Sequence, residues 1–118
     1  MEVRLISDNE LKEFVGFPFE LYRDNQYWVG ELKEDTIKLL KTDNAFWKHA
    51  ERALFMAYQN GKIVGRVMAL VNHAHNEYQK ENIGFFGFFD CVNDEKVSAA
   101  LFAKDMYYTS LKIILSRN

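Results

Sequence analysis

The stretch ALFMAYQNGKIVGRVMALVN, residues 53–72, decides the fold of this chain. It contains two apolar runs with strand character, and the pair Asn60-Gly61 separates them. An Asn-Gly pair between apolar runs is the strongest short signal of a β-hairpin, because both residues tolerate a positive φ in a tight turn. We therefore expect two antiparallel strands, at 53–59 and 62–72.

A second apolar stretch, NIGFFGFFDC at residues 82–91, follows the polar loop HAHNEYQKEN. Phenylalanine favours strands, so we expect a third strand at 83–89 that completes an antiparallel meander. Gly84 and Gly87 lie inside this strand, although glycine weakens one. Two explanations are open: a ligand approaches the bare backbone, or the glycines relieve crowding among the neighbouring phenylalanines.

Helical signals flank the meander on both sides. After a short strand at 3–6, the residues ISDNEL carry a capping box that predicts a helix at 8–15. Gly16 and Pro18 then predict a break or a kink, followed by a second helical piece, PFELYR.

Two more helices are expected, at 33–41 and 94–115. Asn93 and Asp94 can cap the last one. Its expected inner face consists of Val97, Leu101, Tyr108, Leu111 and Leu115, at helical spacing. The predicted fold class is therefore α+β, an antiparallel sheet with flanking helices in the order β-α-α-β-β-β-α.

The composition is that of an ordinary globular protein. A chain of 118 residues is long enough for one domain, 1–118, with a real core. A net charge of −2 argues against nucleic-acid binding and against a basic membrane-surface protein. No apolar run approaches the roughly 20 residues that a membrane helix needs. The single cysteine, Cys91, excludes an internal disulfide and fits a reducing cytoplasm, where we expect the protein to reside.

The histidines do not predict a metal site. His73 and His75 form an H-x-H pair, and His49 lies elsewhere. Zinc needs three or four ligands, and the lone Cys91 has no partner nearby in the sequence. We expect no metal and interpret these side chains as loop histidines.

Three segments together resemble GNAT-type N-acetyltransferases, the acyl-CoA N-acyltransferase-like superfamily. They are FVGFPFELYRDNQYWV, NAFWKHAERALFMAYQNGKIVGRVMALVNHAHNEY and GFFGFFDCVND. The similarity covers roughly residues 10–103, and the expected element order matches the first half of that fold. As a combined pattern it is specific, whereas each piece alone is weak.

The resemblance implies acetyl-CoA as the donor and a small-molecule or peptide amine as the acceptor. In such folds the fourth strand, here 83–89, holds the acetyl and pantetheine part of the cofactor with free backbone groups. A turn before the next helix holds the pyrophosphate. The cofactor-binding residues implied in this sequence are Gly84, Gly87, Phe88, Phe89, Lys96 and Ser98.

Asp90 and Cys91, at the end of the aromatic strand, are the candidate catalytic residues. Either would lie near an acceptor amine and take its proton. The alternatives are that Asp90 is a polar residue flanking the last helix and that Cys91 is a small buried apolar side chain.

Two features depart from the superfamily pattern. Lys96 and Ser98 stand where two glycines usually form the pyrophosphate turn, and Asp94 and Glu95 crowd it with negative charge. The sequence also ends after the last helix, which predicts a C-terminally shortened domain.

Such a shortened sheet would expose the strand at 83–89, so we expect a homodimer that buries this strand, the final helix, or both. The alternative functions are a catalytically inactive remnant that serves as a dimerising or partner-binding module, and an unrelated α+β protein.

Overall fold

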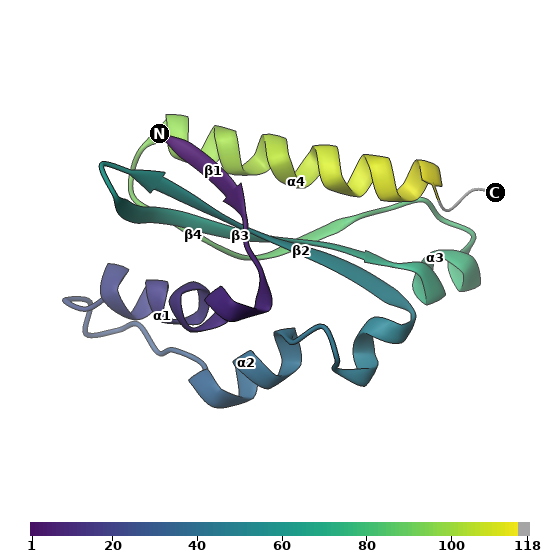
Figure 1. Cartoon of the computed structure of the whole chain (residues 1–118), viewed down its shortest axis with the longest axis horizontal. Coiled ribbons are helices and arrows are strands. Elements are labelled where there is room, and N and C mark those ends of the chain that lie inside the picture. The colour runs from purple at the N-terminus through teal and green to yellow at the C-terminus, as the bar shows by residue number, and fades with distance from the viewer. Residues whose placement is uncertain (116–118) are drawn as a thin grey trace.

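Four antiparallel strands with helices on both sides make up residues 1–115, the part of the chain that the computed structural model describes (Figure 1). The strands, in the order in which they lie in the sheet, are β1 (Glu2–Leu5), β2 (Ala50–Gln59), β3 (Lys62–Asn72) and β4 (Phe85–Cys91). The α-helices are α1 (Leu11–Leu21), α2 (Lys33–Leu40), α3 (His73–Gln79) and α4 (Glu95–Leu115). Short 3-10 helices lie at Asp8–Glu10 and Ala45–Lys48. The predicted α+β class with an antiparallel sheet is confirmed.

The hairpin forms at the predicted turn. Asn60 and Gly61 have φ values of 53° and 77°, so both central residues take the left-handed conformation that a two-residue hairpin turn needs. β2 pairs with β3 along its whole length, and a register shift lies between Ala57 and Tyr58. The hairpin is thus the central part of the sheet, with β1 and β4 as its edges.

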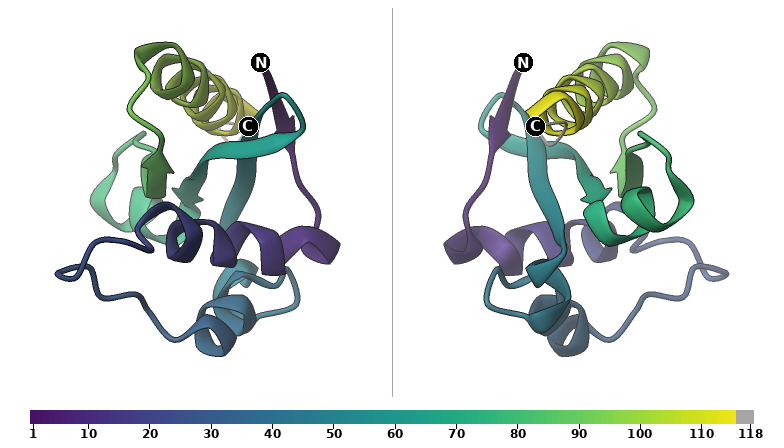
Figure 2. Two further views of the ribbon diagram at one scale, coloured as in Figure 1. Left: turned by 90° about the vertical axis from the view of Figure 1, so that its left-hand side faces the viewer. Right: turned by 90° about the vertical axis from the view of Figure 1, so that its right-hand side faces the viewer.

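The sheet separates two apolar layers, with α1 and α2 on one face and α4 on the other (Figures 1 and 2). Successive residues of a strand point to opposite faces, so β2 serves both layers. Leu54 and Met56 join Phe14 of α1 in one buried cluster. Phe55 joins Leu101 of α4 in the other. This two-sided burial explains why β2 and β3 are almost continuously apolar.

The predicted break after residue 15 is wrong, because α1 continues through Gly16 and Pro18. Proline has no N–H, so the carbonyl of Phe14, four residues earlier, receives no helical hydrogen bond from it. Arg66 of β3 supplies the missing donor, with its Nη1 atom 2.9 Å from the Phe14 oxygen. A long-range hydrogen bond therefore replaces the local one.

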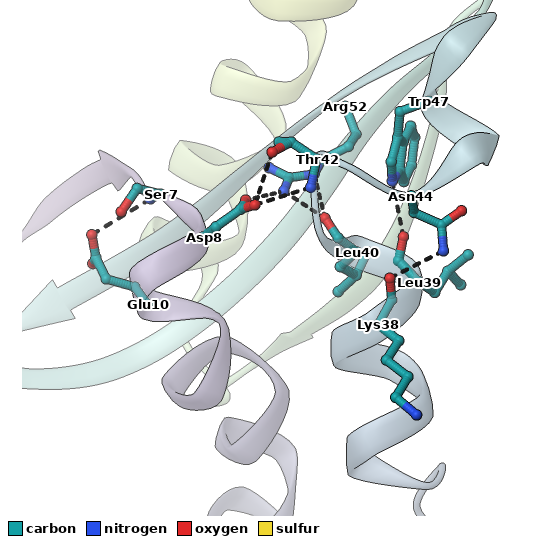
Figure 3. Close-up of polar contacts among 10 residues, drawn as sticks. All are labelled: Ser7, Asp8, Glu10, Lys38, Leu39, Leu40, Thr42, Asn44, Trp47 and Arg52. Carbon is teal, nitrogen blue, oxygen red and sulfur yellow. Dashed lines mark hydrogen bonds and ion pairs between the residues drawn. The ribbon is translucent and has the colours of Figure 1, made fainter.

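The start of this helical segment follows the predicted capping box. The Ser7 N–H donates to Oε1 of Glu10 at 3.5 Å, and a 3-10 turn precedes α1 (Figure 3). The box satisfies a backbone donor that the first turn leaves open.

Arg52 of β2, whose side chain is buried, ties the 3-10 helix before α1 and the end of α2 to the sheet (Figure 3). Its Nε atom lies 3.0 Å from the carbonyl oxygen of Leu40, and its Nη2 atom lies 2.6 Å from Asp8. Asp8 also accepts from the backbone N–H and the hydroxyl of Thr42, at 3.0 and 2.9 Å. Burial opposes ionisation of Asp8, but the Thr42 and Arg52 hydrogen bonds outweigh it and lower its pKa.

The segment between β3 and β4 differs from the predicted loop, because residues His73–Gln79 form α3. Asn72 caps this helix by accepting the N–H of His75 at 3.0 Å. Lys80 ends the helix in the left-handed conformation. β4 then spans Phe85–Cys91 instead of 83–89, which leaves Gly84 outside the strand.

The inner face of α4 also differs from the prediction. Val97 and Leu101 are buried as expected, whereas Leu111 and Leu115 are 40% and 58% exposed. Asp105, one turn after Leu101, is only 5% exposed because helical spacing places it on the buried face. Neither α4 nor another helix of residues 1–115 has the length and apolar character needed to cross a membrane.

Asp105 predicts a distinctive pH dependence of stability. Burial raises its pKa from 3.8 to about 6, and its Oδ1 atom has no hydrogen-bond partner within residues 1–115. The unfolded chain therefore releases this proton at lower pH than the folded one. As pH rises from about 4 to about 6, the folded state loses up to about 3 kcal/mol of stability through this group.

Asp105→Asn should remove this loss and be more stable than the parent chain at pH 7. The measurement is urea denaturation of both chains across that pH range, with the difference in unfolding free energy plotted against pH. A difference that does not change with pH would show that Asp105 titrates normally in the folded chain.

Candidate functional site

The charged pair at the open edge of the sheet joins β3 to β4. Arg66 has a side chain that is 3% exposed, and its Nε and Nη2 atoms lie 3.0 and 2.8 Å from Oδ2 of Asp90. Tyr22, just after α1, donates its hydroxyl to Oδ1 of Asp90 at 2.7 Å. Glu31 Oε1 lies 3.8 Å from Arg66 Nη2. Both oxygens of the Asp90 carboxylate are therefore used within the protein.

Tyr22 keeps its proton at neutral pH. Burial and the hydrogen bond to Asp90 raise its pKa to about 12. Tyr22 therefore acts as a hydrogen-bond donor that holds the Asp90 carboxylate in its paired orientation.

A bulge in β4 accompanies this ion pair. The pairing register with β3 shifts between Arg66 and Met68, and Phe88 takes a φ of 47°. The Phe88 ring lies edge-on to Phe14 at 6.3 Å and 5.4 Å from the guanidinium of Arg66. A bulge bends a strand and redirects its side chains, and bulges are frequent at sheet edges and beside functional sites.

The two glycines of the aromatic stretch have different surroundings. A Cβ atom on Gly84 would lie 2.5 Å from Cβ of Thr109 in α4, so close packing of the helix requires glycine there. A Cβ atom on Gly87 would meet only the Met68 methyl group, at the ordinary contact distance of 3.4 Å. Packing therefore accounts for Gly84 but not for Gly87.

An aromatic cluster lies between β4 and α4. The ring of Phe102 stacks on Phe89 at 4.6 Å and meets Phe86 edge-on at 5.1 Å. Phe86 remains 54% exposed. Because β4 is an edge strand of the sheet formed by residues 1–115, apolar surface and open backbone groups lie next to each other.

The turn between β4 and α4 is acidic. Asp94 precedes α4 and accepts the N–H of Lys96 on its Oδ1 atom at 2.9 Å. Ser98 donates its hydroxyl to the carbonyl of Glu95 at 3.1 Å. A carboxylate thus occupies the helix start, where backbone N–H groups would otherwise bind an anion.

Cys91 is half-buried at the same turn. Burial, together with the nearby charges of Asp90 and Asp94, raises the pKa of its thiol. At neutral pH the protonated form is therefore favoured over the thiolate.

The predicted site residues thus lie along one edge, from Gly84 through Cys91 to Ser98. Their predicted roles in cofactor binding and catalysis remain predictions. The sequence reasoning missed Arg66 and the contact of Tyr22 with Asp90, although a charged residue inside the apolar run VGRVMALV was a signal of a buried ion pair. Within residues 1–115, no group of three His, Cys, Asp or Glu residues is arranged to hold a metal ion.

Two curated bacterial proteins are similar to this chain over most of its length. Protein YghO of Escherichia coli (strain K12) is 34% identical over 97 residues, which are 82% of this chain and 25% of that protein. Bacterial ceramide synthase of Caulobacter vibrioides (strain NA1000 / CB15N) is 33% identical over 95 residues, 79% of this chain and 25% of that protein. The chain is homologous to both and spans about a quarter of their length. No family model and no solved structure matches it.

Proposed function

We propose that this chain forms part of a GNAT-like N-acyltransferase that moves an acyl group from acyl-coenzyme A, such as acetyl-CoA, to an amine. The similarity to a bacterial ceramide synthase supports the reaction class, since a ceramide is an amide of a fatty acid and a long-chain amino alcohol. The resemblance of three sequence segments to GNAT-type proteins supports coenzyme A as the acyl carrier.

The structural part of the proposal rests on Gly87, at the open edge of β4. Gly87 has no packing reason to be glycine, and the bulge at Phe88 interrupts regular pairing beside it. A thin pantetheine arm fits against such bare backbone, and the Phe89 and Phe102 rings supply apolar surface on the α4 side.

The first turn of α4 fits a diphosphate less well. Asp94 already accepts a backbone N–H there, and Glu95 adds another carboxylate, so Lys96 provides the nearby positive charge. In this proposal the donor is held chiefly along β4.

The chain's own polar residues hold the strand in place for this role. Asp90 and Arg66 fix β4 against β3, and Tyr22 holds the carboxylate from the side of α1. Taking a proton on Asp90 would leave Arg66 buried without its counter-charge, which is costly. We therefore assign Asp90 a positioning role, and Cys91, with its raised pKa, no thiolate role.

Donor binding should stabilise the folded chain against heat. A ligand at one hundred times its Kd adds about 2.7 kcal/mol, enough to raise Tm by several degrees. We expect this shift with acetyl-CoA or a long-chain acyl-CoA, measured by differential scanning fluorimetry.

Gly87→Val should abolish the shift by filling the space beside β4. Gly16→Val is the matched control, because a Cβ at Gly16 meets no atom within 4 Å and lies on α1. No shift with either donor, or an unchanged shift in Gly87→Val, would contradict the proposal.

As a second candidate function, we propose a dimerising module in which β4 pairs with β4 of a second copy. Phe86 and Phe89 both contact Phe102 on the α4 side, whereas Gly87 and Phe88 face α1 because of the bulge. A two-fold axis between Gly87 and Phe88 would place Phe86 of one copy opposite Phe89 of the other, on the same face. Because the apolar side chains of the two copies then lie on the same face of the joined sheet, β4 of a second copy is favoured as the pairing strand over an unrelated strand.

Sedimentation velocity at micromolar concentration should then give twice the monomer mass of 13.9 kDa. Phe86→Lys should convert the dimer to a monomer, since a charge on an edge strand opposes pairing. Tyr107→Lys is the control, because Tyr107 is 71% exposed elsewhere on α4. A monomeric parent chain would eliminate this candidate.

A further inference from the structure

A second polar cluster lies where β3 passes into α3. His73 Nε2 is 2.7 Å from Oε2 of Glu51 on β2, and Lys112 Nζ of α4 is 3.1 Å from Oε1 of the same carboxylate. These residues come from three elements that are distant in the sequence.

The backbone holds His73 in a defined place. Its N–H donates to the carbonyl of His49 at 2.9 Å, and the N–H of Ala74 points to the same oxygen at 3.3 Å. The Asn72 cap fixes the first turn of α3 through the N–H of His75. These bonds fix the main chain of His73, and the contact with Glu51 orients its ring, as a binding or catalytic group requires.

The proton arrangement of His73 follows from its partner. Burial opposes ionisation of Glu51, but the contacts with His73 and Lys112 outweigh it and lower the pKa of this carboxyl group. An ionised carboxylate only accepts hydrogen bonds, so Nε2 of His73 carries a proton. In the neutral ring, the other nitrogen, Nδ1, then holds a lone pair and can accept a proton.

His73 also lines a shallow surface pocket together with His49, Ala74, Glu77 and Tyr78. Glu51 and Glu77 contribute two negative charges near this pocket, and Lys112 contributes one positive charge. The excess of negative charge and the Tyr78 ring favour a cationic ligand over an anion.

The pocket lies at the end of the sheet where β4 begins. The ring of His75 is 5.7 Å from the ring of Phe85, the first residue of β4, and Leu70 near the end of β3 pairs with Phe85. The pocket and the start of β4 therefore share one end of the sheet, with His73 and His75 on opposite sides of α3.

We propose that this pocket binds the primary ammonium group of the acceptor and that His73 accepts its proton. This inference rests on the N-acyltransferase function proposed above. One N–H bond of the ammonium breaks, its electron pair stays on nitrogen, and the proton passes to Nδ1 of His73. The resulting imidazolium is stabilised by Glu51, and the neutral amine has the lone pair needed to attack a thioester carbonyl.

The test uses the whole chain and 2-amino-1,3-propanediol, a small primary amine with two hydroxyl groups. Long-range ¹H–¹⁵N spectra of the histidine rings follow a titration to millimolar concentration. The ring signals of His73 should shift in a saturable way, whereas those of His75, which pairs with Glu81 at 3.1 Å, should not. Glycerol, which replaces the amino group by a hydroxyl, should cause no such shift.

His73→Gln should weaken amine binding about tenfold or more, read from the backbone amide of Ala74. His75→Gln, a matched change two residues away, should leave the Kd unchanged. The inference is overturned if no saturable shift occurs, if glycerol gives the same shift, or if His73→Gln binds as the parent does. If the chain binds the amine but no acyl-CoA, the proposed function is contradicted and the amine pocket is retained. If it binds acyl-CoA but not the amine, only the amine pocket is contradicted.

Discussion

The buried guanidinium of Arg66 is the point on which the helical layer and the edge of the sheet both depend. It donates to the Phe14 carbonyl that Pro18 leaves without a partner, and it pairs with Asp90 on β4. A buried charge is tolerated only when it is paired and hydrogen-bonded, so α1, β3 and β4 must meet in this one arrangement. The bulge at Phe88 lies beside this meeting point, next to the register shift between Arg66 and Met68.

A second arginine with a buried side chain makes similar contacts on the neighbouring strand. Arg52 of β2 binds the carbonyl of Leu40 and the carboxylate of Asp8, so it joins the ends of two helices to the sheet (Figure 3). The two arginines fix the layer that covers one face, while the α4 face relies on apolar contacts such as those of Leu101. The candidate donor edge runs along β4, and the His73 pocket lies at the end of the sheet where β4 begins.

Local signals predicted the parts of the fold that local chemistry determines. The Asn60-Gly61 turn and the hairpin strands follow from backbone preferences of neighbouring residues. The continuity of α1 could not be predicted in this way, because its missing donor, Arg66, lies 52 residues from Phe14 in the sequence. Equally, only the packed position of α4 distinguishes Gly84, which contacts Thr109, from a glycine with open space. The sequence identified the candidate site as one stretch of residues. The ion pair between Arg66 and Asp90 could be identified only from the folded structure.

A double-mutant cycle between Arg66 and Pro18 tests the central claim most directly. Pro18→Ala returns an N–H to the helix four residues after Phe14, where it can replace the donor from Arg66. Arg66→Met should cost about 3–5 kcal/mol in the parent chain, because it leaves Asp90 buried without its partner. In the Pro18→Ala background the cost should be smaller by about 1 kcal/mol, measured by urea denaturation. Equal costs in the two backgrounds would contradict the account.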